Sequence, residues 1–247
     1  MNSKTLTCIV VLVLLALPLR GWGASYAAGA YGGFAPSLGG DLHTAQHYSE
    51  FQSHNGIDGM NRSMEGYDTG RIDRILGVTC GMLFKTIFYD YYQVRIAMNY
   101  TWGYFGGSGK TVFDDGGTTR LLDCEYSFWE ADIPVTFGIS IPFWKDIRIA
   151  FSCGLAYAYA DYSYRFESST GQQWKGSFAG WGLPLVIILE GEYFVTENVA
   201  ASTSLVYYKG STKVLKDGSD AGGTDFARID FSGYRYSLGV TYYFGSI

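Results

Sequence analysis

Charged side chains are scarce in this chain. Lys, Arg, Asp and Glu make up 17% of the 247 residues, and the formal net charge is only −5. So low a charged fraction is unusual for a soluble protein of this length. The mildly acidic balance also gives a nucleic-acid partner no electrostatic support.

Cysteine is rare as well. One of the four cysteines, Cys8, lies in an N-terminal apolar run, which leaves Cys80, Cys124 and Cys153. Three irregularly spaced cysteines exclude a disulfide framework and a cysteine metal cluster. We expect Cys80 and Cys153 to be small apolar residues on strand faces.

Histidine occurs only in the stretch around residues 43 to 54. His43, His47 and Glu50 would share one face if a helical turn formed there, which is a metal-ligand spacing, but nothing else in the stretch fixes that geometry. We expect a polar loop containing His54 and no metal site. No catalytic triad or cofactor motif stands out, so we expect neither an enzyme nor a cofactor.

Long hydrophobic runs are absent outside the N-terminus. There, Lys4 precedes LTCIVVLVLLALPL, Pro18 ends the run, and the small residues of RGWGAS follow. This pattern predicts a signal peptide over residues 1–24 and a mature domain over 25–247. Without a transmembrane helix, the mature chain is either an exported soluble protein or a β-barrel.

What the chain does have is period-2 alternation. In YQVRIAMNYTWGY, residues 92–104, large apolar side chains alternate with small or polar ones, as on the two faces of a strand. Similar or weaker patterns predict eight strands, at 25–37, 75–88, 92–104, 128–141, 147–160, 180–193, 199–209 and 234–244. The first and seventh alternate least clearly.

Short and long connections alternate along the chain. We predict short turns near 89–92, 143–146 and 194–198, and long polar links at 39–71, 106–126, 162–177 and 210–228. Long loops at one end and short turns at the other are typical of transmembrane barrels. GGSGKT, within the second link, lacks the first glycine of a phosphate-binding loop and is expected to be a flexible surface loop.

The strand at 147–160 indicates which face is inside. One face carries Arg148 and then only Ala, Ser and Gly, whereas a water-facing surface is about 25–35% charged. The other face is apolar, with aromatic residues toward the strand ends. We therefore predict an all-β, eight-stranded antiparallel transmembrane barrel with its apolar face outward. A lipocalin-like barrel with the apolar face inward would need more Lys and Glu on the opposite face.

Charged residues on the predicted inner faces form the candidate site: Lys85, Arg95, Glu130, Asp132, Arg148, Glu190, Glu192 and Arg235. Buried charges must be paired, and we expect Arg95 to pair with Glu130 and Asp132 on the neighbouring strand. The network is either a structural plug or a gate whose partners exchange. The many small inward residues either leave unfilled space or let the strands coil tightly.

Two short motifs carry a resemblance. The terminal SLGVTYYF, with Ser237, Gly239, Tyr242 and Phe244, resembles the β-signal by which outer-membrane barrels are recognised for insertion, although three residues follow it here. WEADIPVTF, residues 129–137, resembles a fourth-strand segment. The mature chain resembles small bacterial outer-membrane barrels of the OmpA-domain, OmpX and OmpW kind.

This resemblance implies an outer-membrane location, a monomer, and lipid and the barrel assembly machinery as partners. Two functions remain open. The first is a narrow conduit or binding cavity for small apolar solutes, as similarity to OmpW-like barrels implies. The second is a non-conducting display protein whose long loops contact host molecules.

Overall fold

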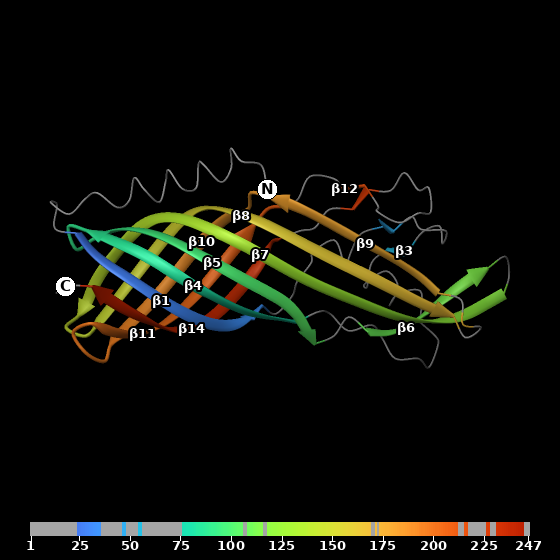
Figure 1. The fold of residues 1–247 in the computed structure, drawn as a ribbon, viewed down its shortest axis with the longest axis horizontal. Helices are drawn as coiled ribbons and strands as arrows, with labels where there is room; N and C mark the ends of the chain where they lie inside the picture. Colours follow the sequence, from blue (N-terminus) through green and yellow to red (C-terminus); the bar gives the residue numbers. More distant parts are fainter. Residues whose placement is uncertain are drawn as a thin grey trace.

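Eight long antiparallel strands close into a barrel in the computed structural model (Figure 1). They are β1 (Ala24–Ala35), β4 (Leu76–Phe88), β5 (Tyr92–Phe105), β7 (Thr118–Trp144), β8 (Ile147–Ser168), β10 (Leu185–Phe194), β11 (Val199–Lys209) and β14 (Gly233–Phe244). The structure describes residues 24–35, 46–47, 54–55, 76–105, 108–115, 118–168, 171, 173–211, 215–216, 226–227 and 231–244. In these ranges no helix is long and apolar enough to cross a membrane.

The ring runs β1–β4–β5–β7–β8–β10–β11–β14 and returns to β1. Every neighbouring pair is antiparallel, including the closing pair, in which Tyr26 lies opposite Phe244. Ala24 lies opposite Phe88 at the β4–β5 turn, so the start of β1 and the end of β14 both lie at the short-turn end. The predicted fold class is confirmed. The predicted leader lies outside the described residues except Ala24, which begins β1.

The three short turns lie where the alternation predicts them. Between β4 and β5, the Tyr91 N–H donates to the Phe88 carbonyl at 3.1 Å. Tyr89 and Asp90 both have positive φ angles, 51° and 63°. That pair of angles makes a type I′ turn, whose twist matches antiparallel strands.

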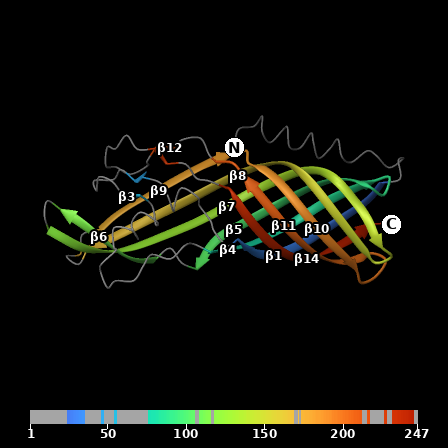
Figure 2. The ribbon, with the colours of Figure 1, turned by 180° about the vertical axis from the view of Figure 1, so that it is seen from behind.

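Two of the predicted long links are wrong, because they are largely strand. β6 (Ser108–Asp115) pairs with the first part of β7, and β9 (Gln173–Gly182) pairs with the last part of β8. GGSGKT therefore enters a strand at Ser108 instead of forming a flexible loop. The four strands make a wall that extends from the barrel, on the right of Figure 1 and the left of Figure 2. The prediction failed because the alternation changes sense beyond the barrel: polar residues such as Ser163 and Arg165 occupy the outward positions at which the barrel strands carry apolar residues.

The predicted strand at 180–193 is divided. Its alternation continues unbroken, but β9 ends at Gly182 and β10 begins at Leu185, and both pair with β8. In the remaining long links the structure describes only two-residue ladders, β2 (Gln46–His47) with β3 (His54–Asn55) and β12 (Leu215–Lys216) with β13 (Phe226–Ala227). His47 thus lies in extended backbone. His43 and Glu50 fall outside the described residues.

The apolar faces of the strands point outward, as predicted. Leu238 is 71% exposed and Met82 is 63% exposed, whereas Lys85 is fully buried. The exposed apolar residues of the central band include Met98, Phe137, Ile139, Phe151, Leu155, Leu189 and Val240. Free Cys80 and Cys153 are also exposed on this face. In water, an apolar surface exposed in this way would be unfavourable because of the hydrophobic effect. The hydrocarbon core of a membrane accepts it without that cost.

Aromatic rings edge the apolar band. At the end away from the turns, Trp129 lies 5.4 Å from Tyr159 between ring centroids, and Tyr157 lies 6.0 Å from Trp181. Beyond this belt the outward face becomes hydrophilic, with Ser127 hydrogen-bonded to Ser163 at 2.7 Å. The turn end has its own exposed rings, including Tyr92, Phe143, Trp144 and Tyr193. Such paired belts mark the two interfaces of a membrane barrel.

Close approach of adjacent strands gives a first prediction. A Cβ atom added at Gly138 of β7 would lie 2.0 Å from the Phe151 carbonyl oxygen of β8. Gly138→Ala should therefore lower the free energy of unfolding by about 1–3 kcal/mol through overpacking, measured by urea titration in lipid vesicles. The matched control is Gly191→Ala, whose Cβ would meet Thr203 at an ordinary 3.6 Å. Equal stability of the two variants would contradict the backbone contact.

Candidate functional site

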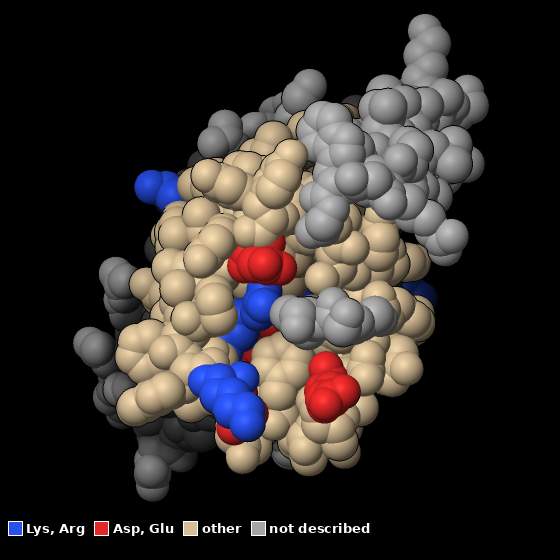
Figure 3. Space-filling view, turned by 90° about the vertical axis from the view of Figure 1, so that its left-hand side faces the viewer, with Lys and Arg blue, Asp and Glu red and all other residues tan. Residues whose placement is uncertain are grey.

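All eight predicted inward charges lie inside the barrel. Each of these residues is 6% exposed or less. Four are cations and four are anions, so these eight residues carry no net formal charge. The strand alternation explains their placement, because each occupies a position opposite to the lipid-facing set. Figure 3 views the barrel from its turn end, where charged atoms of both signs are visible at the surface.

One group of charges lies on β4 and β10. Lys85 Nζ is 2.9 Å from Glu190 Oε1 and 2.5 Å from Glu192 Oε1. The Tyr243 hydroxyl donates to Glu192 Oε2, and the Lys85 ammonium lies 5.2 Å from the Tyr243 ring centroid. Lys85 therefore has both of its carboxylates in direct contact.

A second group centres on Asp132 of β7. Arg235 of β14 donates to Asp132 Oδ2 at 2.8 Å and to Glu130 Oε1 at 2.6 Å. The other Asp132 oxygen accepts from the Tyr208 hydroxyl at 2.7 Å and from Asn99 Nδ2 at 2.8 Å. The guanidinium of Arg235 also lies 3.8 Å from the Tyr208 ring centroid. Each carboxylate of this group has a direct contact with Arg235, which is the one cation that the two share.

These contacts join opposite walls. In the ring of eight strands, β4 and β10 are four places apart, and so are β7 and β14, and β5 and β11. The contacts Lys85–Glu190, Asp132–Arg235 and Asn99–Tyr208 therefore span the diameter of the lumen. We call these three contacts the cross-lumen braces. While they hold, a straight axial channel is blocked by side chains.

Arg95 does not have the partners that we predicted. Arg235 takes both Glu130 and Asp132, while Arg95 Nε lies 3.8 Å from Glu190 Oε2. The register explains the error: Arg95 lies opposite Thr136, four residues along β7 from Asp132, and four residues of strand span about 13 Å.

Arg148 lies near the turns, at the start of β8. Its guanidinium reaches the Asp90 carbonyl oxygen at 3.5 Å and Ser140 Oγ at 3.4 Å, both long contacts. Among the ion pairs of the described residues, none joins a carboxylate to it within 4 Å. Arg148 is thus the inward charge with the weakest compensation.

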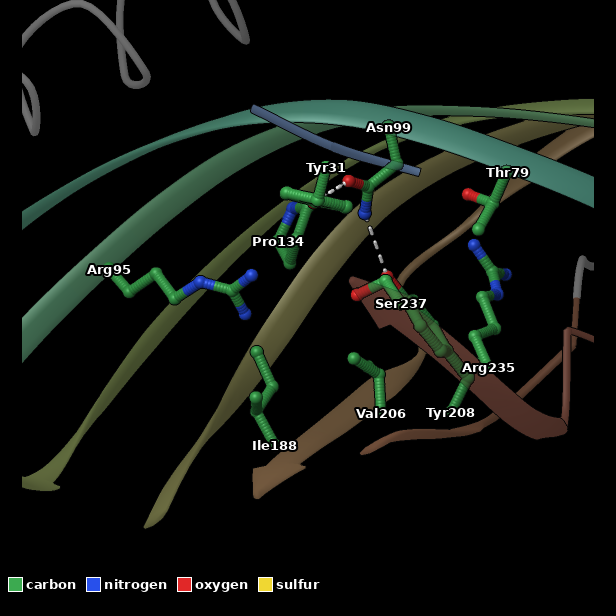
Figure 4. Close-up of a pocket in the computed structure, with 10 residues that line it drawn as sticks. All are labelled: Tyr31, Thr79, Arg95, Asn99, Pro134, Ile188, Val206, Tyr208, Arg235 and Ser237. Atoms are coloured by element: carbon green, nitrogen blue, oxygen red, sulfur yellow. Dashed lines mark hydrogen bonds between the residues drawn. The ribbon is translucent and has the colours of Figure 1, made fainter. Parts of the chain in front are cut away.

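A small cavity lies between the two charge groups (Figure 4). Arg95, Asn99, Pro134, Ile188 and Tyr208 contribute to its lining. It has room for about one water molecule. The small inward residues of β8 leave little other space here, because Ala156 packs in one cluster with Val186, Ile188, Val206 and Tyr208.

The β5–β7 hydrogen-bond ladder beside this cavity is interrupted, although the two strands keep the same register on both sides of the interruption. The β5–β7 register runs to Ile96 opposite Val135 and resumes at Asn99 opposite Asp132, which leaves Ala97 and Met98 without ladder partners on β7. Pro134 lies in this gap and lines the cavity. Proline has no N–H to donate to a ladder, which accounts for the interruption.

Sequence reasoning missed two lumen residues, Tyr31 and Tyr208. The Tyr31 hydroxyl donates to Asn99 Oδ1, and Tyr208 is 1% exposed. Both lie on the two strands that alternate least clearly. Small residues occupy every second position from 200 to 204, and continuing that alternation along the strand would have placed Tyr208 inside.

The terminal strand places its predicted signal residues on two faces. Ser237 hydrogen-bonds Ser204 inside the lumen at 2.6 Å, and Gly239 lies opposite Tyr31. Tyr242 and Phe244 point outward with ring centroids 5.1 Å apart. The described residues contain no group of three His, Cys, Asp or Glu side chains that could hold a metal ion.

No model of a known protein family matches the chain, and no curated protein matches it. Among solved structures, OprG from Pseudomonas aeruginosa matches with a TM-score of 0.50 and 12% identity, over 91% of this chain and 97% of that one. A major outer membrane protein from Thermus thermophilus matches at 0.47, with 11% identity over 90% and 99% of the two chains. Neisserial surface protein A matches at 0.40, with 11% identity over 89% and 98%.

Fold, outward apolar band and ionic interior together define a transmembrane β-barrel. More particularly, the chain has the fold of the small eight-stranded outer-membrane barrels. At this level of identity the likeness concerns the fold, so a more specific function has to be argued from the interior.

The cross-lumen braces give a second prediction. Arg235→Met leaves Glu130 and Asp132 buried without their cation, so it should lower the free energy of unfolding by about 3–5 kcal/mol. The control is Arg165→Met. Arg165 is 2.9 Å from Glu167, but their side chains are 50% and 40% exposed, and such pairs contribute about 0–1 kcal/mol. Urea titration in vesicles measures both, and similar losses would contradict the brace.

Proposed function

We propose that this protein is an integral outer-membrane barrel that takes small, largely apolar solutes into its lumen and releases them sideways into the bilayer. The observation that carries the proposal is the interrupted β5–β7 ladder at Pro134, beside the internal cavity. A barrel wall normally pairs every backbone group. A gap next to a cavity is therefore the part of the wall that opens at the least cost in hydrogen bonds.

The interior favours a sideways route over an axial one. The Lys85 group lies between the cavity and the turn end and joins opposite walls through charged contacts of 2.9 Å or less. An apolar solute gains nothing by replacing such contacts, because separating buried charges is costly. The way to the turns is therefore closed to it, and entry from the opposite end requires the Arg235–Asp132 contact to separate.

Outside the gap, the wall offers an apolar surface. Met98 is 59% exposed and its neighbours on the outward face of β5 are Ile96 and Tyr100. A solute that leaves the cavity past Pro134 meets these side chains and then lipid tails. Because the cavity has room for about one water molecule, its side chains must move when a solute enters.

The remaining parts of the proposal follow the sequence. The residues before β1 serve as an export signal, and Ser237, Gly239, Tyr242 and Phe244 present the insertion signal to the barrel assembly machinery. The barrel works as a monomer without a cofactor and is not an enzyme.

Entry of the apolar dye N-phenyl-1-naphthylamine into porin-depleted diderm cells tests this function, because its fluorescence rises when it reaches lipid. Cells that display the wild-type barrel should take up the dye several-fold faster than cells without it. Pro134→Ala restores an N–H to the ladder and should return the rate toward that of cells without the barrel.

The matched control is Pro142→Ala, a change in the same strand near the turn end, away from the cavity lining. It should leave dye entry at the wild-type rate. Planar bilayers that contain the barrel should show no steady ionic conductance, since the braces block the axis. Equal dye entry with and without the barrel would refute the function, and a steady conductance would refute the sideways route.

A second candidate function is supported by the wall of β6, β7, β8 and β9. This wall extends past the aromatic belt, and its outward face is hydrophilic, with Arg165 opposite Lys175 across β8 and β9. A rigid surface of this kind is suited to contact molecules outside the cell. Arg165→Ser with Lys175→Ser should then weaken adhesion of displaying cells to host extracellular matrix without altering dye entry. Unchanged adhesion would remove this candidate.

A further inference from the structure

Arg95 is a buried cation with weak compensation. It is 3% exposed, and its Nε has no hydrogen-bond partner among the described residues. It approaches Glu190 at 3.8 Å, and its guanidinium lies 5.7 Å from the Tyr31 ring centroid. Figure 4 shows the guanidinium reaching into the cavity between Pro134, Ile188 and Ser237.

Glu190 does not compensate Arg95 fully. Its Oε1 already accepts from Lys85 at 2.9 Å, and its Oε2, the atom near Arg95, has no hydrogen-bond partner in the described part of the chain. Arg235, the other arginine of the cavity lining, contrasts with this, because it donates to two carboxylates at 2.8 Å and 2.6 Å. Leaving a buried donor without a partner is unfavourable, so Arg95 is poised to accept a ligand.

The rest of the lining is amphipathic. Ile188, Val206 and Pro134 offer apolar surface beside the Arg95 guanidinium. The Thr79 hydroxyl accepts from Thr101 at 2.9 Å and keeps its own hydrogen available for a ligand. In Figure 4 the Arg95 guanidinium and the Thr79 hydroxyl lie on opposite sides of the cavity, so the Arg95 guanidinium is the donor group beside Pro134 and Ile188. This suits a ligand with one anionic oxygen group and an apolar body.

We propose that Arg95 recognises the carboxylate of small monoanionic amphiphiles and so selects which solutes the cavity admits. The planar guanidinium holds the carboxylate through two parallel hydrogen bonds, and the aliphatic part lies along Ile188, Val206 and Pro134. This inference rests on the proposed function, of which it names the substrate class.

Hexanoate and 1-hexanol are matched probes, because they share the apolar body and differ in the carboxylate. The ¹⁵N-labelled barrel is placed in lipid nanodiscs, and the Arg95 Nε–H resonance is assigned by its loss in Arg95→Met. Hexanoate should shift this resonance saturably and bind about tenfold more tightly than hexanol. Hexanol should shift cavity residues such as Asn99 without shifting Nε–H in the same way.

The variants separate recognition from packing. Arg95→Met should bind both probes equally, and Arg95→Lys, which keeps the charge but not the planar fork, should retain only part of the preference. Arg148→Met changes the other poorly compensated inward arginine, which is not in the cavity lining, and should preserve the preference.

Each result decides between the two proposals. Equal binding of hexanoate and hexanol by the wild-type barrel would overturn the role of Arg95 and leave the sideways conduit standing. A preference that survives Arg95→Met would also overturn it. If neither probe shifts any cavity resonance, both the inference and the proposed function fail. The wild-type comparison stands even if an Arg95 variant does not fold.

Discussion

The whole structure depends on one constraint: backbone N–H and C=O groups in hydrocarbon must find partners within the chain. Closing β1 onto β14 meets that constraint by removing both edges of the sheet. Closure in turn fixes the two faces, since every strand must show alternate residues to lipid and to the lumen. In a closed ring a missing ladder bond is exceptional, and the β5–β7 ladder lacks bonds at Pro134.

The side chains of eight strands also have to fill a narrow lumen. Small residues on one wall pack in the same cluster as large ones from another, as Ala156 of β8 does with Tyr208 of β11. Charges are compensated across the diameter instead of between neighbouring strands, with Lys85 on β4 reaching Glu190 on β10. Such an interior is rigid where charged side chains have their hydrogen-bond partners and rearranges more easily where they lack them. Arg95 is intermediate, because it lies 3.8 Å from Glu190 while its Nε has no hydrogen-bond partner among the described residues.

Much of the fold could be predicted from the sequence, because alternation and orientation are properties of single strands. The faces of the strands that carry Met82 and Leu238 were evident from period 2 alone. The wall of β6, β7, β8 and β9 was missed because its alternation has the opposite sense, with polar residues such as Arg165 and Lys175 at the outward positions.

The candidate site was predictable in its members and not in its pairs. Each of the eight charges could be assigned to the lumen from its own strand. Which charges pair depends on how far the tilted strands are shifted relative to one another along the barrel axis. The alternation within a single strand carries no information about that shift. Arg95 opposite Thr136, instead of opposite Asp132, is an example of such an offset.

The cross-lumen braces also bear on the order of assembly. Asp132 and Arg235 are 103 residues apart, and Lys85 and Glu190 are 105 apart. Arg235 is carried by the terminal strand, so the carboxylates of Glu130 and Asp132 gain this cation only when β14 and β7 face each other across the ring. Until the ring closes, those carboxylates need water or another partner, because a buried charge without a partner is costly.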